Sequence, residues 1–230
     1  MKYDILGSNM QHLRVTLEEG DKIYADSGSF ISKTQNVTMV PKLVGGVISA
    51  LERKATGMTA TLTEFAVRDG SGTGDVSVSG VFPGKIFQVA LAEGQKFVIE
   101  RYSLLAADSS VTYTIKAMNL GAMIFAKSGY YLLELVGPGN AFIHVVGDII
   151  EHNITEGNLV EVDPQHVAGF DSTLNYSVKS VENIRTAMFG GIGLFLATFT
   201  GNGRLITHSV SRHKLSVEIY LEALGQQKQK

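Results

Sequence analysis

The sequence predicts an all-β fold, and three observations support this prediction. Residues 76–81 and 111–115 alternate apolar and polar side chains, as strands with one buried face do. Clusters of Asp, Ser and Gly, which favour turns, separate the alternating segments. A Glu-Gly dipeptide opens three matching stretches that align without gaps, at Glu19-Gly20, Glu93-Gly94 and Glu156-Gly157. Short strands, tight turns and internal repetition together indicate one β body.

The repeated stretches divide the chain into three pseudo-repeats of a small β unit. We expect these pseudo-repeats over residues 15–90, 91–153 and 154–220, within a single domain that spans residues 1–230. Their spacing is longer than that of solenoid repeats, so we expect three units around a shared core. Residues 221–230, which end in the polar run GQQKQK, predict a frayed tail.

Each pseudo-repeat contains the same order of strand signals. Residues 21–40, 95–115 and 158–178 each predict a strand, a turn and a second strand. Each pseudo-repeat then closes at a pair of glycines, at residues 72 and 74, 137 and 139, and 201 and 203. The strands expected after these pairs lie at residues 75–80, 140–145 and 204–209. Glycine supplies the positive φ of a tight turn, so each pair predicts a hairpin with a return strand.

Helical signals are confined to connectors. Residues 47–54 predict two helical turns that end at Gly57, and residues 183–188 predict a weaker helical segment. Near the C-terminus, residues 214–220 alternate like a strand, and residues 221–224 then favour a helix. The prediction is therefore an all-β body with short helical connectors.

Composition excludes several classes of protein. The chain of 230 residues is 44% hydrophobic, which is typical of a globular protein. Its net charge of −2 provides no global attraction for nucleic acid or anionic membranes. Without cysteine it has no disulfides, thiolate nucleophiles or cysteine-based metal sites. No signal peptide or transmembrane segment is predicted, so we expect a cytoplasmic protein.

Five segments carry a resemblance to a known family. They are EGDKIYADSG at residues 19–28, GGVISALER at 45–53, FPGKI at 82–86, DPQHVAGF at 163–170 and AMFGGIGL at 187–194. In this order the chain resembles the altered-inheritance-of-mitochondria 24 family, a family of unknown function. That family is similar in fold to the tryptophan RNA-binding attenuation protein (TRAP). The resemblance implies a TRAP-like double-stranded β-helix and no known catalytic residue or cofactor. Residues 119–125 depart from the double-glycine connector of the family.

Two histidines occupy matching positions in their repeats. His144 and His208 each lie five residues after the last glycine of the pair, and Ser79 takes the third place. One interpretation is that both side chains point outward or form hydrogen bonds in a polar layer. The alternative is a metal site of two histidines and a carboxylate, as in a cupin-like protein that binds a metal or a small ligand. For His166 we expect a structural hydrogen bond at a bend.

Three acidic residues also match between the repeats, namely Asp26, Glu100 and Asp163. Together they could hold a cation, but each lies at a turn, where carboxylates usually accept backbone hydrogen bonds. No Gly-x-Ser-x-Gly elbow or phosphate-binding loop is present, so no catalytic residue is predicted. RNA binding by analogy of fold is a second alternative, but the basic clusters lack a repeated aromatic platform.

The connectors between strands are rich in glycine and large apolar residues, although loops are normally polar. Such segments pack on their own barrel, on another subunit or on the surface of a membrane, and no other feature of the sequence supports the membrane contact. The residues predicted to form this partner or self-assembly surface are Val47, Ile48, Leu51, Met188, Phe189 and Ile192. The leading hypothesis is therefore a non-enzymatic assembly or scaffold protein that forms a homo-oligomer or binds a protein partner.

Overall fold

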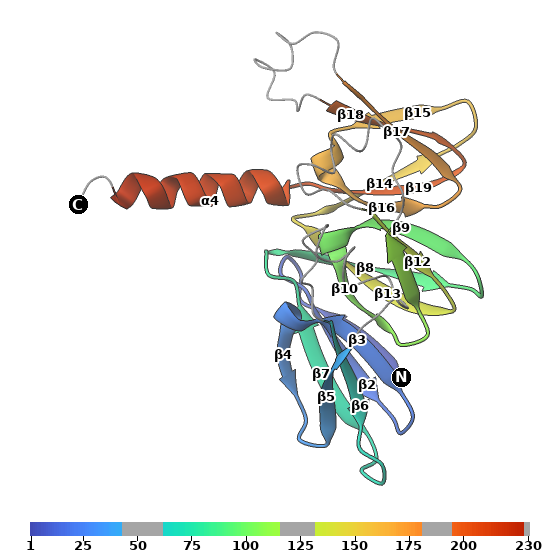
Figure 1. Ribbon diagram of the computed structural model, residues 1–230, viewed down its shortest axis with the longest axis vertical. Coiled ribbons are helices and arrows are strands. Elements are labelled where there is room, and N and C mark those ends of the chain that lie inside the picture. Colours follow the sequence, from blue (N-terminus) through green and yellow to red (C-terminus); the bar gives the residue numbers. More distant parts are fainter. Residues whose placement is uncertain (43–61, 116–131, 181–194, 228–230) are drawn as a thin grey trace.

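The computed structural model describes residues 1–42, 62–115, 132–180 and 195–227. These residues form four β-sheets and one α-helix, which confirms the predicted all-β class. The strands follow one another along the long axis of the molecule, from the N-terminal strands at one end to β15, β17 and β18 at the other (Figure 1). Among the described helices, none has the length and apolar character needed to cross a membrane.

The strands fall into three groups, which we call units one, two and three. Unit one follows the first strand, β1 (Lys2–Leu6), and its second and third strands flank the 3-10 turn η1 (Ser27–Ser29). Its strands are β2 (His12–Leu17), β3 (Lys22–Asp26), β4 (Phe30–Lys33), β5 (Val37–Lys42), β6 (Leu62–Val67) and β7 (Gly74–Ser79).

Units two and three contain the same order of elements. Unit two consists of β8 (Gly84–Leu91), β9 (Lys96–Glu100), η2 (Arg101–Ser103), β10 (Leu104–Asp108), β11 (Thr112–Ile115), β12 (Leu132–Val136) and β13 (Gly139–Val146). Unit three consists of β14 (Ile149–Ile154), β15 (Leu159–Val162), η3 (Pro164–His166), β16 (Val167–Asp171), β17 (Leu174–Ser180), β18 (Phe195–Gly201) and β19 (Gly203–His208).

The strand pairings within a unit are the same in all three. The first strand pairs with the sixth, and the sixth pairs with the third, where each unit has a register shift. The second strand pairs with the fifth, and the fifth pairs with the fourth. Each unit is therefore built from two three-stranded antiparallel sheets.

Neighbouring units are joined by one further pairing, which we call a joint. At the first joint, β3 of unit one pairs with β10 of unit two through three residue pairs that include Tyr24 and Ala107. At the second joint, β9 of unit two pairs with β16 of unit three, again through three pairs, including Val98 and Phe170. Each joint fuses two three-stranded sheets into a six-stranded sheet.

The joints also connect the hydrophobic cores. Each unit has its own cluster of buried side chains, so the expected single core shared by the three units is wrong. Because side chains alternate along a strand, a strand at a joint serves two clusters. Ile23 and Ala25 pack in the core of unit one, whereas Tyr24 between them packs in the core of unit two. Val98 of unit two packs in the same way in the core of unit three.

Two strands at the ends of the molecule are equivalent to the strands that pair at the joints, but the described residues contain no neighbouring unit with which they could pair. These are β4 of unit one, which is equivalent to β10 and β16, and β15 of unit three, which is equivalent to β3 and β9. Ile31 and Leu159 on these strands are 52% and 54% exposed, although strands at the internal joints are almost wholly buried. The two strands are free sheet edges in the described structure.

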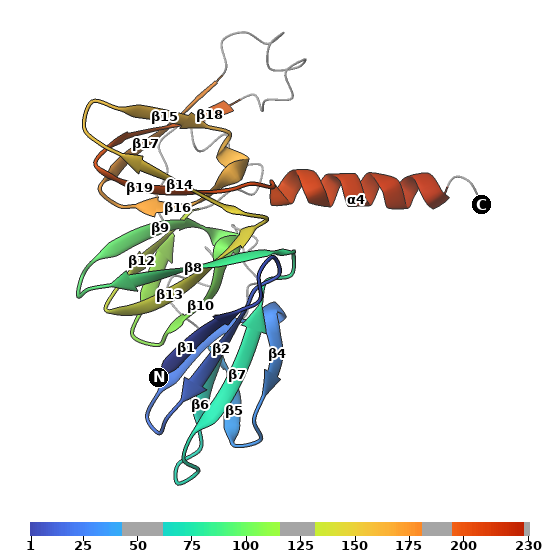
Figure 2. The same ribbon diagram turned by 180° about the vertical axis from the view of Figure 1, so that it is seen from behind.

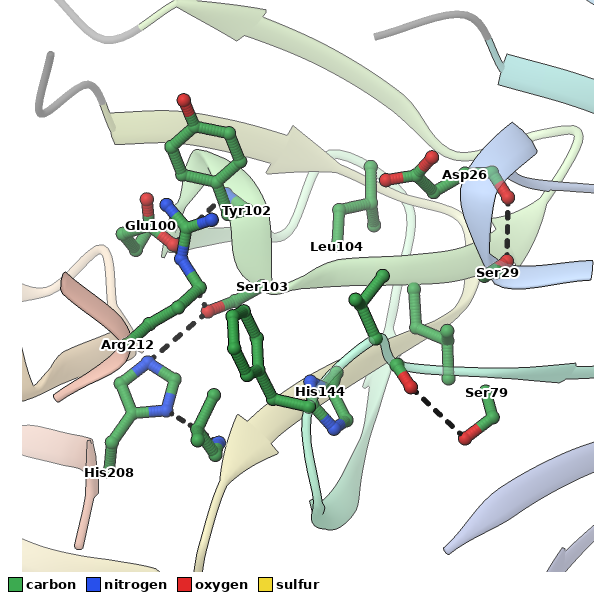
Figure 3. A pocket seen from close by; sticks show the side chains of 15 residues that line it. Asp26, Ser29, Ser79, Glu100, Tyr102, Ser103, Leu104, His144, His208 and Arg212 are labelled. Carbon is green, nitrogen blue, oxygen red and sulfur yellow. Dashed lines mark hydrogen bonds between the residues drawn. The ribbon is translucent and has the colours of Figure 1, made fainter. Parts of the chain in front are cut away.

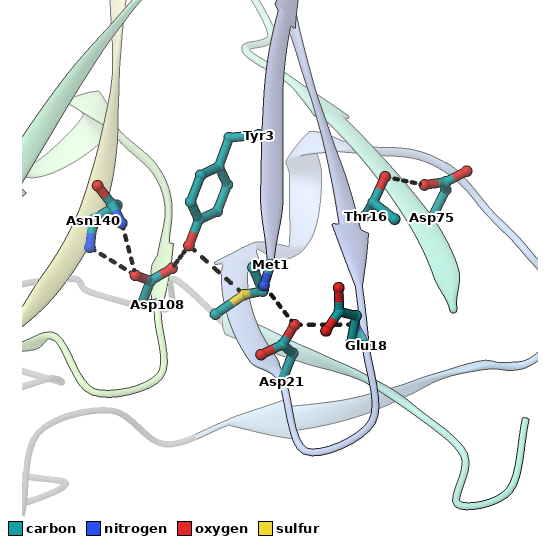
Figure 4. A network of polar contacts seen from close by, with 8 residues as sticks. All are labelled: Met1, Tyr3, Thr16, Glu18, Asp21, Asp75, Asp108 and Asn140. Carbon is teal, nitrogen blue, oxygen red and sulfur yellow. Dashed lines mark hydrogen bonds and ion pairs between the residues drawn. The ribbon is translucent and has the colours of Figure 1, made fainter. Parts of the chain in front are cut away.

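The first strand ties units one and two together. β1 pairs with β2, and the hydroxyl of Tyr3 donates a hydrogen bond to Asp108 of unit two (Figure 4). The same carboxylate accepts a hydrogen bond from the Asn140 amide at 2.7 Å. The terminal amine of Met1 forms an ion pair with Asp21 at 2.8 Å. β1 therefore contributes polar contacts at the first joint in addition to strand pairing.

The predicted return strands exist as β7, β13 and β19, but the predicted hairpins are wrong. In each unit, the strand before the glycine pair and the strand after it belong to different sheets. A hydrogen bond at the start of the sixth strand explains why no hairpin forms. There, a backbone N–H donates to the side chain of the residue that ends or follows the third strand, and so joins the sixth strand to the sheet of the third. The acceptor is Asp108 for Asn140, Asp171 for Arg204 and Thr34 for Asp75. The glycine pairs are corners between sheets.

The predicted C-terminal strand over residues 214–220 is also wrong. These residues lie in α4 (Arg212–Gln227), which projects away from the β-sheets (Figures 1 and 2). Ser211 caps the helix, since its side chain and carbonyl accept hydrogen bonds from the amides of Lys214 and Leu215. Residues 221–227, expected in the frayed tail, continue this helix. Leu, Glu and Ala favour helix, and no strand of the described ranges pairs with residues 214–220.

Candidate functional site

A cavity of about 120 Å³ lies beside the joints and is the candidate functional site. All three units contribute to it, and the first residue of α4 closes one side (Figure 3). The lining residues come from the ends of strands β3, β7, β9, β10, β13 and β19, from the 3-10 turns η1 and η2, from the loop after β7 and from α4. Those with polar side chains are Asp26, Ser29, Ser79, Glu100, Tyr102, Ser103, His144, His208 and Arg212.

The cavity brings together the matching positions Ser79, His144 and His208, which lie on or next to the sixth strand of each unit. Both ring nitrogens of His208 contact polar groups within the protein. Its Nδ1 accepts a hydrogen bond from the Val146 amide at 2.9 Å, so Nε2 carries the proton and faces Ser103 Oγ at 3.4 Å. Burial lowers the pKa of His208 to about 3, and the ring is therefore neutral at physiological pH.

His144 is the buried polar group of this cavity that lacks a partner. Its ring forms a hydrogen bond to the backbone of Phe82, and burial lowers its pKa. Nε2 has no hydrogen-bond partner among the described residues. The ring also packs closely on Gly80, where an added Cβ would lie 2.3 Å from it, so glycine is required there. A neutral imidazole with a free Nε2 is a hydrogen-bond acceptor.

The described residues do not assemble a metal site around these histidines. Within the described ranges, no group of three or more His, Asp or Glu side chains is placed to hold a metal ion. In addition, the Val146 amide occupies the Nδ1 lone pair of His208. The geometry gives the two-histidine metal hypothesis no support.

The three matching carboxylates act as caps of the 3-10 turns. Asp26 accepts a hydrogen bond from the Gly28 amide, Glu100 from the Tyr102 amide and Asp163 from the Gln165 amide, at 2.9–3.0 Å. The turn interpretation therefore describes these three carboxylates, and in the described ranges they do not form a group placed to hold a metal ion. Asp26 and Glu100 line the cavity, whereas Asp163 forms an ion pair with Lys214 at 2.9 Å.

Glu100 has an additional property, because its side chain is only 7% exposed. Burial raises its pKa to about 7, although the positive charges of Arg212 and Arg101 act in the opposite direction. Ser103 Oγ lies 3.5 Å from the carboxylate, so His208, Ser103 and Glu100 form a chain of polar contacts. At neutral pH the carboxyl group changes between its protonated and ionised forms.

Sequence reasoning missed Arg212 and Tyr102 as parts of this site. The guanidinium of Arg212 lies 3.5 Å from the centre of the Tyr102 ring, and the guanidinium of Arg101 lies 3.9 Å from it. Arg212 is the first residue of α4, whereas a strand was predicted over residues 214–220, directly after it. The capping residue Ser211 was the signal that could have indicated a helix.

Two further expectations concern residues away from the cavity. Nδ1 of His166 lies 2.7 Å from the carbonyl oxygen of His208, which is the structural hydrogen bond expected at this bend. The predicted helical connectors over residues 47–54 and 183–188 lie outside the described residues. The same holds for all six residues of the predicted partner surface, which are Val47, Ile48, Leu51, Met188, Phe189 and Ile192.

The fold is that of an all-β protein with a cavity between its units, and its described residues contain no group of three or more His, Asp or Glu side chains placed to hold a metal ion. Residues 3–210 match the family model described as Mitochondrial biogenesis AIM24, and the chain belongs to this family. α4 lies outside the matched residues. The resemblance to the altered-inheritance-of-mitochondria 24 family is thereby confirmed.

Two similar proteins come from Streptococcus pyogenes. An uncharacterized protein of serotype M6 is 25% identical over 206 residues, which cover 86% of this chain and 81% of that protein. A crystal structure of protein SPYM3_0169 matches with a TM-score of 0.77 and 22% identity, over 96% of this chain and 99% of that chain. The second similarity shows the fold alone.

Proposed function

We propose that this protein is a non-enzymatic assembly protein whose copies associate head to tail through β4 and β15. The observation that carries this proposal is the pair of free edges. Each internal joint pairs the second strand of one unit with the third strand of the next, and these two strands are the ones left without that partner. A free strand edge is a ready template for pairing with another chain.

The pseudo-repeat architecture belongs to the same proposal. We infer that the three units are copies of one TRAP-like β unit, with the double-stranded β-helix as its general fold. The repeated element order, the repeated pairings and the register shift in each third strand support this inference. If the units are copies, a joint between two chains can reproduce a joint within one chain.

The residue pairs of the internal joints then predict which residues of β4 and β15 face each other when two chains associate. Ala107 faces Tyr24 at the first joint, and Phe170 faces Val98 at the second. Counted from the 3-10 turns, the equivalent residues are Lys33 on β4 and Glu161 on β15. A lysine opposite a glutamate is complementary, and cross-strand pairs of opposite charge stabilise sheet pairing. Neither residue forms an ion pair within the described chain.

Charge reversal and sedimentation velocity test this proposal. The wild type is expected to associate as its concentration rises. Lys33→Glu and Glu161→Lys each place like charges opposite one another and are expected to weaken association by about tenfold, because like-charge contacts in interfaces are costly. The double variant, or an equimolar mixture of the two single variants, restores opposite charges and is expected to restore association.

Arg68→Glu is the matched control, because Arg68 lies in an exposed turn outside β4 and β15. Its sedimentation should equal that of the wild type. A wild type that stays monomeric at every concentration would contradict the proposal. Single variants that associate normally would exclude β4 and β15 as the interface.

A further inference from the structure

Arg212 is a charged residue of the cavity whose hydrogen-bond donors are unused. Its guanidinium carbon lies 3.5 Å from the centre of the Tyr102 ring, and at this distance the two groups contact face to face. Within the described ranges the Arg212 side chain forms no ion pair and no hydrogen bond, whereas Lys214 on the same helix pairs with Asp163 at 2.9 Å. The N–H groups of a guanidinium point outward in its plane, so stacking on the ring leaves them available.

The start of α4 holds this guanidinium in place. Arg212 follows Ser211, which is buried, caps the helix and donates a hydrogen bond to the side chain of Gln165 at 3.1 Å. The Tyr102 ring supports the other end of the Arg212 side chain. A side chain held at both ends loses little freedom when it binds a partner, which favours binding.

The groups around Arg212 favour an anion with a single negative charge. His144 and His208 also line the cavity, and burial lowers the pKa of both, so they are neutral at physiological pH. Glu100 lies on the same side of the cavity as Arg212, and Asp26 lies on the opposite side (Figure 3). Burial raises the pKa of Glu100 to about 7, so below this pH its carboxyl group is neutral. One negative charge is attracted by Arg212, whereas a second would be repelled by the acidic side chains of the wall.

The rest of the wall is largely apolar, and the cavity is small. A cavity of about 150 Å³ holds benzene, so a cavity of about 120 Å³ has room for about six non-hydrogen atoms. A carboxylate group with a tail of two or three carbon atoms has this size. The apolar residues of the wall, which can contact such a tail, are Val81, Phe82, Leu104, Leu105 and Val146.

We propose that the cavity binds a small monocarboxylate of three or four carbon atoms, whose carboxylate pairs with the guanidinium of Arg212. Two N–H groups of a guanidinium donate in parallel to the two oxygens of a carboxylate, and this match makes arginine a specific partner of the group. The short tail lies along the apolar part of the wall. This site is distinct from the free edges of β4 and β15, so it does not depend on the assembly proposed above.

The test uses the full chain labelled with ¹⁵N at arginine, and butyrate as the probe. Butyrate in the millimolar range is expected to shift the Nε resonance of Arg212 in a saturable manner. Butyramide has the same shape without the charge, and sulfate has two charges without the tail, so both should bind at least tenfold more weakly. Butyramide or sulfate that binds as tightly as butyrate, or butyrate that causes no saturable shift, would overturn the assignment.

Variants at Arg212 locate the site, and the methyl resonances of Leu104 and Val146 report binding to them. Arg212→Gln should weaken butyrate binding at least tenfold, because it removes the charge. Arg212→Lys should weaken binding less, because it keeps the charge but loses the paired donors. Arg68→Gln is the matched control, since Arg68 is exposed and lies outside the cavity, and it should bind like the wild type. Wild-type affinity in Arg212→Gln would refute the proposal.

The pH dependence of binding tests the place of the carboxylate beside Glu100. A bound carboxylate is repelled by ionised Glu100, so the wild type should bind butyrate several-fold more weakly at pH 8 than at pH 6. The charges that act on Glu100 are those of Arg212 and Arg101, which do not change in this range, and His208, which contacts it through Ser103, stays neutral. Glu100→Gln should therefore bind butyrate equally at both pH values. A Glu100→Gln variant that keeps the pH dependence of the wild type would contradict this place.

Discussion

In the buried polar chain of His208, Ser103 and Glu100, the two titratable residues, Glu100 and His208, make the stability of the fold depend on pH in opposite directions. Burial raises the pKa of Glu100 from 4.5 to about 7, so the folded state holds this proton more tightly than the unfolded state does. The free energy of unfolding therefore falls as pH rises between 4.5 and 7. Burial lowers the pKa of His208 from 6.5 to about 3, so its contribution rises with pH between 3 and 6.5.

Removing one member of this pair should expose the effect of the other. In Glu100→Gln, the contribution of His208 is unopposed, and the lowered pKa of His144 acts in the same direction. The free energy of unfolding should then rise by at least about 1 kcal/mol between pH 5 and 6. Urea denaturation at several pH values measures this slope.

The wild type is the reference for this slope, because the two contributions oppose each other there. His208→Asn should show a slope lower than that of the wild type over the same range. If Glu100→Gln and the wild type have the same slope, Glu100 does not hold its proton in the folded protein at pH 5–6.

Sequence reasoning identified part of the site at the residue scale. Ser79, His144 and His208 were matched by their distance from a glycine, and the structure brings them to one cavity. The caps Asp26, Glu100 and Asp163 were matched by register in the same way. Tyr102 and Arg212 were missed, because their contact joins unit two to α4 and no local pattern encodes such a contact.

At the scale of elements, the joints explain which strand predictions succeeded. The strands β3, β9, β10 and β16 were located correctly, although continuous burial interrupts their alternation. Their partners could not be predicted, because the pairing joins two units and depends on tertiary packing. The hairpins failed for the same reason, since glycine indicates a turn but does not specify the sheet to which the next strand belongs.

Gly169 tests how closely the second joint is packed. A Cβ added at Gly169 would lie 2.8 Å from the carbonyl oxygen of Val98 and 2.7 Å from the Phe97 ring. Gly169→Ala should lower the free energy of unfolding by about 1–3 kcal/mol, because overpacking forces the backbones apart. Chemical denaturation measures the loss.

Gly225→Ala is the matched control, since nothing lies within 4 Å of an added Cβ in α4. It should leave the unfolding of the β-sheets unchanged, because α4 projects away from them. A Gly169→Ala variant as stable as the wild type would mean that the backbones of β9 and β16 separate without loss.

At the scale of the whole molecule, the described units form an open array with two internal joints and two free ends. Amide hydrogen exchange should reflect this arrangement, since it reports local opening. We expect slow exchange along β3, β9, β10 and β16, and faster exchange along β4 and β15 in dilute solution. NMR measured at two protein concentrations should show added protection of β4 and β15 at the higher one.

The internal joints serve as references in that experiment, because their protection should not depend on concentration. Faster exchange at β3 and β10 than at β4 and β15 would argue against the joints as the stable parts of the array. Equal exchange of β4 and β15 at both concentrations would argue against association through these strands.

The position of Tyr24 has a consequence for synthesis on the ribosome. Tyr24 is part of unit one in sequence but packs in the core of unit two. When the first unit emerges, this ring stays exposed and the outer side of β3 stays unpaired until β10 has been translated. Each nascent unit therefore waits for the next one to complete its folding, and β15 emerges with no following unit among the described residues to do so.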